Sequence, residues 1–195
     1  MVLQFKSKQN KVYLQGGEVK KIFKSAEAAR FEADFLRALA NKGVSVPAVI
    51  KVEENALFME FIDGDTLPDF LVKTRDKEKF VTAADALTNW LTGFYTAVDY
   101  DVSKEIRGDV NGRNFIICGG KCYGVDFEKH VKGKKERDAG RLLAFCATYS
   151  LPDETVRDFF VSELKNELTD RLGLDLTLVL QYFENELDAM NKRRR

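Results

Sequence analysis

The sequence has no excess of charge of either sign, because its 31 lysine and arginine residues balance its 31 aspartate and glutamate residues. A dedicated nucleic-acid-binding protein normally carries a basic excess, so this balance argues against that class. No apolar run approaches the ~20 residues that a membrane-spanning helix needs, and the N-terminus carries no long apolar segment of a secretory signal. The three cysteines are too few, and odd in number, for a disulfide framework. We therefore expect a soluble cytoplasmic protein that does not enter a membrane.

The sequence also lacks the glycine motifs that commonly cradle nucleotide phosphates. Neither a Walker A pattern nor a Rossmann G-x-G-x-x-G pattern occurs in it. With 195 residues, of which 45% are hydrophobic, the chain is still long enough to bury a real core, as one domain or two small lobes. Its function has to be inferred from other motifs.

The most informative stretch covers residues 106–117, Ile-Arg-Gly-Asp-Val-Asn-Gly-Arg-Asn-Phe-Ile-Ile, and is followed by Val-Asp-Phe at 125–127. An Asp, an Asn five residues later, an apolar strand, a short hairpin and an Asp-Phe pair resemble the catalytic core of kinase-like phosphotransferases. Phosphoryl transfer needs a carboxylate that orients and deprotonates the acceptor hydroxyl, and oxygen ligands for Mg²⁺. The stretch predicts Asp109 for the first role, and Asn114 with Asp126 for the second. The alternative is that these are polar loop residues at the end of an ordinary hairpin.

The part of the chain before this stretch predicts an α+β unit that ends near residue 62. Its β-rich runs predict five strands, over residues 2–5, 11–14, 19–23, 46–52 and 56–62. Gly16-Gly17 predicts a tight turn between the second and third strands, because glycine reaches positive φ without penalty. One helix is predicted over residues 25–40, with Ser25 as its N-cap. Its predicted apolar face consists of Phe31, Phe35, Leu36 and Leu39.

A lysine on the third strand and a glutamate on this helix would make an ion pair of the kind that positions nucleotide phosphates in kinases. Lys20 and Lys21 are adjacent on the strand and therefore point to opposite faces. Glu32 borders the predicted apolar face of the helix and suits the pair better than Glu27. We expect Lys21 and Glu32 to pair, although a lysine on an edge strand often serves solubility alone.

After residue 62 the pattern is mainly helical. Helices are predicted over residues 67–72, 83–98, 152–168 and 176–190, with a further helix that begins at Asp138. The charged stretch 73–79 is predicted to be a solvated loop, and residues 192–195, Lys-Arg-Arg-Arg, a frayed basic tail.

Residues 46–49, Val-Pro-Ala-Val, and 57–67, Leu-Phe-Met-Glu-Phe-Ile-Asp-Gly-Asp-Thr-Leu, resemble the strand, hinge and following helix of small atypical kinases. The likeness is to the RIO kinases, the small kinase of the KEOPS tRNA-modification complex and the aminoglycoside phosphotransferases. It extends over nearly the whole chain and implies a two-lobed protein kinase-like fold of the α+β class. The implied N-lobe, residues 1–62, has a five-stranded antiparallel sheet plus one helix, and the implied C-lobe, residues 63–195, is mostly helical.

The resemblance also implies ATP as the nucleotide and Mg²⁺, or alternatively Mn²⁺, as the metal. It implies that the backbone of Glu60, Phe61 and Ile62 binds adenine, that Met59 lies at the back of the pocket, and that Val19 contributes to nucleotide binding. It further implies that Asp138 caps its helix and braces the catalytic loop. The short distance from Asp126 to Asp138 leaves no room for a long activation segment.

The sequence departs from the family pattern in several places. The loop between the first two strands has no glycine motif, so Ser7, Asn10 and backbone amides are expected to hold phosphate less closely than glycines allow. Arg107 stands where the family usually has a His, a change that concerns the packing of the loop more than its chemistry. Glu128 stands where kinases have Gly, which makes this segment less free to move. Arg113 is a candidate for neutralising charge on the transferred phosphoryl group.

These observations predict a minimal ATP- and Mg²⁺-dependent phosphotransferase that acts on a hydroxyl group of a protein, such as serine or threonine, or of a small molecule. Since little of the chain lies outside the core, a protein acceptor or autophosphorylation is slightly favoured. One alternative is a pseudokinase that binds nucleotide or a partner and transfers nothing. Another is an accessory ATPase for RNA modification with the basic tail on RNA, against which the neutral overall charge argues.

Overall fold

The computed structural model describes residues 2–5, 9–128, 131–151 and 153–194. Strands and one helix form its N-terminal part, and helices dominate the rest. The predicted α+β class is therefore confirmed.

The N-terminal sheet is antiparallel throughout and has the strand order β1-β2-β3-β5-β4. Its strands are β1 (Val2–Phe5), β2 (Lys11–Gln15), β3 (Glu18–Ile22), β4 (Val49–Glu53) and β5 (Ala56–Glu60). Gly16 (φ 63°) and Gly17 (φ 84°) form the expected turn between β2 and β3, with left-handed backbone that glycine adopts freely. The five predicted strands are all present, but residues 46–48 lie before β4 and not in it.

Helix α1 (Ala26–Asn41) follows β3 and begins after Ser25, whose hydroxyl accepts a hydrogen bond from Ala28 N at 3.2 Å. The predicted N-cap is therefore confirmed, but the predicted apolar face is partly wrong. Phe31 is 43% exposed, whereas Glu32 is only 1% exposed. Because an ion pair with Lys21 compensates the charge of Glu32, the helix can turn this carboxylate inward and leave Phe31 at the rim.

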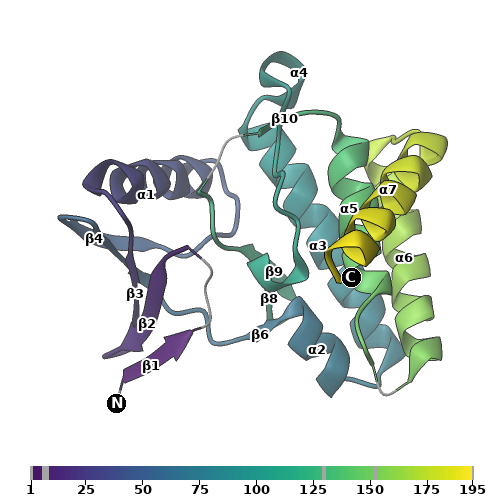
Figure 1. Ribbon diagram of the computed structural model, residues 1–195, viewed down its shortest axis with the longest axis horizontal. Helices are drawn as coiled ribbons and strands as arrows, with labels where there is room; N and C mark the ends of the chain where they lie inside the picture. Colours follow the sequence, from purple (N-terminus) through teal and green to yellow (C-terminus); the bar gives the residue numbers. More distant parts are fainter. Residues whose placement is uncertain (1, 6–8, 129–130, 152, 195) are drawn as a thin grey trace.

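The chain after β5 forms short strands and a group of helices, as Figure 1 shows. The elements are β6 (Asp65–Thr66), α2 (Leu67–Lys73), α3 (Lys77–Ala97), α4 (Tyr100–Ser103), β7 (Glu105–Ile106), a 3₁₀ turn (Gly112–Asn114), β8 (Phe115–Cys118), β9 (Lys121–Gly124), β10 (Val131–Lys132), α5 (Lys135–Ala147), α6 (Glu154–Leu172) and α7 (Leu176–Arg194). β6, β8 and β9 form a three-stranded sheet, and β10 pairs with β7. None of the described helices is both long and apolar enough to cross a membrane.

Several predicted boundaries in this part are wrong. Helix α3 begins at Lys77 instead of residue 83, because Asp76 accepts a hydrogen bond from Glu78 N at 3.0 Å and acts as an N-cap. The predicted solvated loop over residues 73–79 is therefore helical from Lys77 onward. Helix α6 continues to Leu172, where Gly173 (φ 61°) ends it. Helix α7 continues to Arg194, so the predicted frayed tail is helical as far as the structure describes it.

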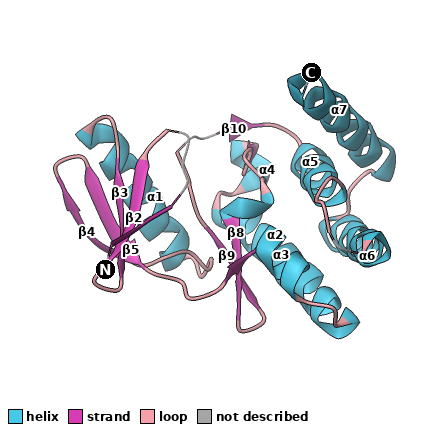
Figure 2. Ribbon diagram, turned by 60° about the horizontal axis from the view of Figure 1, so that its bottom comes forward, coloured by secondary structure: helices cyan, strands magenta, loops and turns pink. Residues whose placement is uncertain are grey.

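The arrangement of these elements places the catalytic motif in the middle of the molecule. Figure 2 shows the N-terminal sheet and α1 on one side, α5, α6 and α7 on the other, and the β8–β9 hairpin with α3 between them. The catalytic motif predicted from the sequence enters this hairpin from β7.

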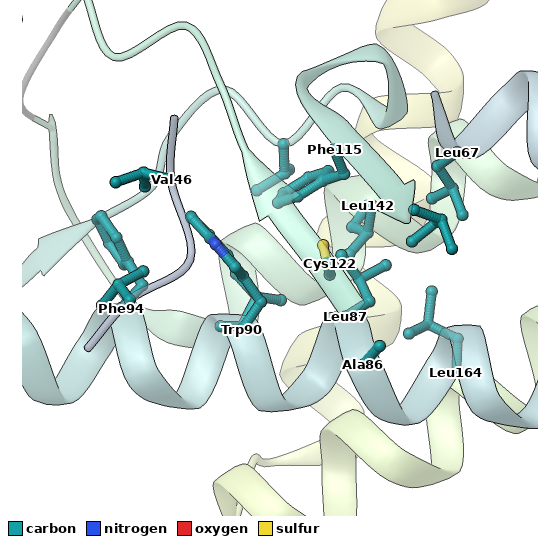
Figure 3. Close-up of a cluster of buried hydrophobic side chains, with 14 of the residues drawn as sticks. Val46, Leu67, Ala86, Leu87, Trp90, Phe94, Phe115, Cys122, Leu142 and Leu164 are labelled. Atoms are coloured by element: carbon teal, nitrogen blue, oxygen red, sulfur yellow. The ribbon is translucent and has the colours of Figure 1, made fainter. Parts of the chain in front are cut away.

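Aromatic side chains fix the hairpin to α3 (Figure 3). The ring of Trp90 on α3 stacks on Phe94 at 5.5 Å and meets the edge of Phe115 at 5.3 Å. Its indole nitrogen donates a hydrogen bond to Ser45 O at 2.8 Å, which satisfies the one polar atom of the ring. Phe127, which follows the predicted metal residue Asp126, lies 6.1 Å from the same indole. Residues 125–128, called the metal segment below because they include the predicted metal ligand Asp126, follow β9 without forming a strand and are anchored by this aromatic cluster.

Helices α5 and α7 approach each other closely at Gly140, where a side chain would not fit. A Cβ atom at this position would lie 2.5 Å from Val179 O, 2.7 Å from Tyr182 Cβ and 2.8 Å from Phe183 N. Two of these neighbours are backbone atoms, which cannot move aside without displacing α7.

We predict that Gly140→Ala lowers the free energy of unfolding by about 1–3 kcal/mol, as overpacking of a close contact does. Gly93→Ala in α3 is the matched control, because a Cβ there would meet only Val44 Cγ2 at 4.0 Å. That control should raise the free energy of unfolding by up to about 1 kcal/mol, since alanine favours a helix interior over glycine. Urea unfolding of both variants measures the difference, and equal effects would contradict the close α5–α7 contact.

Candidate active site

The side chains of Lys21 on β3 and Glu32 on α1 meet in the interior. The ammonium of Lys21 lies 2.8 Å from Glu32 Oε2 and 3.1 Å from Oε1, and both residues are buried. Lys20 points to the opposite face of the sheet, with its ammonium 5.2 Å from the centre of the Phe58 ring. Glu27 is exposed on α1. The structure therefore brings together the two residues that the sequence selected.

The same ammonium also contacts two carboxylates that come from the segment after β9. It lies 2.5 Å from Asp126 Oδ1 and 3.1 Å from Glu128 Oε1. Burial alone would lower the pKa of Lys21, but Glu32 and Asp126 outweigh it and hold this pKa above its usual value. Burial raises the pKa of Glu32, whereas Lys21 overcomes burial at Asp126 and lowers the pKa of that carboxyl.

The three carboxylates form a group that can hold a divalent cation. Oxygen atoms of Glu32, Asp126 and Glu128 all lie within 4.8 Å of one another. Carboxylate oxygens of this kind are ligands that Mg²⁺ prefers. Asn114, the other predicted ligand, belongs to the 3₁₀ turn before β8. The donor set therefore fits the metal that the resemblance implies.

Asp109 lies on the surface, in a loop whose backbone turns sharply. Gly108 has φ of 73°, and a Cβ there would lie 2.7 Å from Val131 Cγ2, so this position requires glycine. Asp109 N donates to Arg107 O at 2.9 Å, and Asp109 Oδ1 accepts from Asn111 N at 3.3 Å. These contacts direct the exposed carboxylate of Asp109 away from the core.

Asn114 is hydrogen-bonded both to this loop and to the metal segment. Its side-chain Nδ2 donates to Asp109 O at 3.2 Å, and Oδ1 is left as the atom that can bind a cation. Its backbone oxygen accepts from Val125 N at 2.9 Å. These two hydrogen bonds connect Asn114 to Asp109 and to Val125, the residue directly before Asp126. Asp126 itself has φ of 67°, a left-handed conformation that is uncommon for residues other than glycine.

Asp138 braces the catalytic loop, as expected, but does not cap a helix. Helix α5 begins at Lys135, and Asp138 lies buried in its first turn. Its Oδ2 accepts from Arg107 N at 2.7 Å and from Tyr95 Oη at 3.0 Å, and its Oδ1 accepts from Gly108 N at 3.0 Å. Because the amides of the loop donate to the Asp138 carboxylate, it does not accept a hydrogen bond from the described backbone N–H groups at the start of α5. Burial raises the pKa of Asp138, against the effect of these donors.

Arg107, the residue that replaces the usual histidine, links the predicted catalytic loop to the metal segment. Its guanidinium donates to Val125 O at 2.6 Å and to Asp126 O at 2.8 Å. The guanidinium carbon also lies 4.4 Å from the centre of the Phe127 ring, a cation–π arrangement. Burial lowers the pKa of Arg107. The sequence raised a question about the packing of this loop, and the structure answers it with a buried, stacked arginine.

Most of the predicted nucleotide-binding residues lie on, or directly after, β3 and β5, which are neighbouring strands inside the N-terminal sheet. Val19 and Met59 are paired neighbours on β3 and β5, and Met59 is buried. In the predicted hinge, Glu60 N donates to Ala48 O at 2.9 Å, and Ile62 O accepts from Gly64 N at 3.0 Å. Phe61 lies between them and is half-buried.

The predicted phosphate-binding loop gives a mixed result. Ser7 lies outside the described residues. Asn10 donates a short hydrogen bond to Glu128 Oε1, so in this structure its side chain contacts the metal segment. Arg113 is exposed, and its backbone N donates to Asn111 Oδ1 at 3.0 Å.

Sequence reasoning missed two supports of the loop. Gly112 N donates to Tyr149 Oη at 3.1 Å, and Arg141 Nη1 donates to Gly108 O at 2.6 Å. Both partners come from helix α5 or the residues just after it, and no local pattern marked either one. Only the nearness of residues 138–149 to the catalytic motif in the fold reveals them.

A comparison with protein-family models matches residues 3–145 to the RIO domain. This match covers most of the chain. The chain belongs to the RIO domain family. A search of curated protein sequences found no match.

Solved structures share the fold of this RIO domain. A gentamicin complex of APH(2")-IIa superimposes with a TM-score of 0.67 at 15% sequence identity, over 94% of this chain and 80% of the other. The ADP-bound aminoglycoside phosphotransferase APH(2'')-Ib gives 0.63 at 12% identity, over 96% and 92%. Amicoumacin kinase hAmiN, in complex with AMP-PNP, Ca²⁺ and Ami, gives 0.59 at 14% identity, over 93% and 77%. Family and fold together place the chain in the protein kinase-like superfamily of phosphotransferases.

We predict that Asp138→Asn lowers the free energy of unfolding by about 1–3 kcal/mol, because an amide N–H₂ would then face a donor of the loop or Tyr95 and leave it unpaired. Tyr95→Phe removes one donor and keeps the carboxylate, so its cost should be nearer about 1 kcal/mol. Urea unfolding followed by circular dichroism tests this order. Equal losses in the two variants would mean that the carboxylate does not brace the loop.

Proposed function

We propose that this RIO domain transfers the γ-phosphoryl group of ATP to a hydroxyl group. The observation that carries the proposal is the contact between Lys21 of the N-terminal sheet and Asp126 of the metal segment. Glu32 contacts the same ammonium. The contact between Lys21 and Asp126 joins the two parts of the molecule at the place where phosphates have to be held. We propose that the two implied lobes divide the function between them. Residues 1–62 would bind nucleotide, and residues 63–195 would supply the catalytic loop and the metal ligands.

Each residue has one task in the proposed reaction. Asp109, exposed at the end of the braced loop, accepts a hydrogen bond from the acceptor hydroxyl and takes its proton as the oxygen attacks the γ-phosphorus. The bond from the γ-phosphorus to the β–γ bridging oxygen breaks, and ADP leaves with the electron pair. Lys21 donates to the nucleotide phosphates, and Glu32 orients its ammonium. Asn114 and Asp126 would hold Mg²⁺, which when bound supplies positive charge to the phosphate oxygens.

The adenine is proposed to lie beside Val19 and Met59, against the backbone of Glu60, Phe61 and Ile62. Ser7, Asn10 and backbone amides of their loop are proposed to cover the phosphates. The similar solved structures, with ADP, ATP or AMP-PNP in their complexes, support a nucleotide at this place.

The acceptor is proposed to be a hydroxyl of a protein or of a small molecule. The similar structures include complexes with gentamicin, streptomycin and Ami, so proteins of this fold can bind small molecules. The exposure of Asp109 and Arg113 equally leaves space for a side chain of another protein.

A pseudokinase that binds nucleotide without transfer is the second candidate. It is favoured by the contacts of Asn10 and Lys21 with Glu128, which draw the predicted phosphate loop onto the metal segment. ATP would have to displace the Asn10 contact before the loop could hold phosphate.

We predict that Asp109→Asn reduces ATP turnover by about 10²–10⁴-fold, because a general base is lost, while ATP binding measured by calorimetry is retained. Asp126→Asn should abolish the Mg²⁺ or Mn²⁺ dependence of ATP binding together with turnover. Asp101→Asn, a change at an exposed position on α4, is the control and should behave as wild type. Metal-dependent ATP binding by the wild type without turnover, also in the presence of acceptor mixtures, would favour the pseudokinase.

We predict that Arg113→Ala reduces turnover by at least about tenfold without weakening ATP binding, if its guanidinium stabilises charge that develops during transfer. Lys121→Ala removes another exposed cation, at the tip of the β8–β9 hairpin, and should leave turnover unchanged. Steady-state rates of both variants at saturating ATP provide the comparison. Unchanged turnover in Arg113→Ala would remove this residue from the mechanism.

A further inference from the structure

The C-terminal helix α7 lies beyond residues 3–145, the part of the chain that matches the RIO domain. It is nevertheless connected to the catalytic loop by an unbroken series of hydrogen bonds. This series ends at the residue directly before Asp109.

The first step of the series is at Gly108. Its N–H donates to Asp138 Oδ1 at 3.0 Å, and its carbonyl oxygen accepts from Arg141 Nη1 at 2.6 Å. Asp138 and Arg141 both belong to helix α5. The two polar groups of Gly108 are therefore held by one rigid helix, and the backbone direction at Asp109 depends on both bonds.

The second step is at Arg141 itself. Its Nε donates to Glu186 Oε2 on α7 at 2.9 Å. The plane of a guanidinium fixes the angle between its Nε and Nη1 donors. A carboxylate that holds Nε consequently sets where Nη1 points, which is at Gly108 O.

The third step is at Glu186, which is only 8% exposed. Its other oxygen, Oε1, accepts from Nη2 of Arg193, the next-to-last residue of α7, at 2.7 Å. Burial alone would raise the pKa of Glu186, but Arg193 and Arg141 outweigh it and hold this pKa below its usual value. Both carboxylate oxygens are thus engaged, and the carboxylate cannot rotate freely.

The close contact at Gly140 makes the connection rigid. The backbone of α7 passes so near to Gly140 that no side chain fits between the helices. Gly140 adjoins Arg141 in the sequence, so α7 is fixed in place next to the point where Glu186 reaches the arginine.

We propose that Glu186 is a positioning residue of the active site, which acts through Arg141 on the carbonyl of Gly108 and so holds Asp109 at its reacting position. The role in catalysis rests on the proposed phosphotransfer, whereas the effect on the loop does not. In this protein α7 then completes the catalytic loop from outside the region that matches the family.

We predict that Glu186→Gln lowers kcat by about 10- to 100-fold, because small misplacements of a reacting group have effects of this size. The KM for ATP should stay unchanged, since Lys21, Glu32 and the hinge are untouched. Glu184→Gln is the matched control, at an exposed position on the same helix, and should keep wild-type kcat. Amide hydrogen exchange of residues 105–112 should be faster in Glu186→Gln than in the control.

A double variant shows whether Glu186 acts through Arg141. If it does, Arg141→Gln with Glu186→Gln should be no slower than Arg141→Gln alone, because the two residues form one series. Additive losses in kcat would overturn the proposed route. Arg193→Gln leaves the bond between Arg141 and Glu186 in place, so its loss of kcat should be smaller.

Two further outcomes would overturn the proposal. One is unchanged exchange at residues 105–112 together with wild-type kcat in Glu186→Gln. The other is faster exchange throughout α5 and α7, with a lower urea midpoint, and unchanged kcat in the folded fraction, which would mean that the ion pair serves stability alone. If the wild-type protein shows no ATP turnover, the proposed phosphotransfer fails, and the exchange of residues 105–112 still decides whether Glu186 positions the loop.

Discussion

The buried ammonium of Lys21 is the interaction on which the site depends. It contacts three carboxylates from two parts of the chain, Glu32 on α1 and Asp126 and Glu128 in the segment after β9. A buried charge is tolerated only when it is paired and hydrogen-bonded. For this reason β3, α1 and the metal segment have to meet at the ammonium of Lys21. One ammonium balances only part of the negative charge of three carboxylates whose oxygen atoms lie within 4.8 Å of one another, so they repel each other. The site is therefore electrostatically suited to receive another cation.

The catalytic loop is held in a different way, through its backbone. Hydrogen bonds with side chains of α5 hold Arg107 N, Gly108 N and Gly108 O. The Arg107 guanidinium in turn donates to the carbonyl oxygens of Val125 and Asp126. Side chains that bind backbone groups fix the path of the chain without using the side chains of the loop. Asp109 is consequently left exposed for chemistry although the residues before it are buried.

Much of this arrangement could be predicted from the sequence. Local periodicity indicated the strands and helices, and the resemblance to kinase-like phosphotransferases indicated which polar residues on them form the site. Alternation along a strand separated Lys21 from Lys20, and the paired glycines marked the turn before them. The predictions that were wrong concern choices that only tertiary contacts make. Periodicity put Phe31 on the buried face of α1, but the charge on Lys21 drew Glu32 inward and turned Phe31 toward solvent. Asp138 resembled a helix cap by position, but the amides of a loop thirty residues earlier in the chain compete for its carboxylate.

The basic C-terminus shows the same limit most clearly. In the sequence, Arg141, Glu186 and Arg193 are ordinary charges of amphipathic helices, and residues 192–195 look like a solubilising tail. The separation of 45 positions between Arg141 and Glu186 puts their pairing beyond any local pattern. The pairing is possible only because Gly140 lets α5 and α7 touch, and that reason for a glycine inside a helix becomes visible only in the fold. A glycine that weakens the helix locally thus permits a contact that reaches the catalytic loop, so the helical propensity of α5 is subordinate to the geometry of the site.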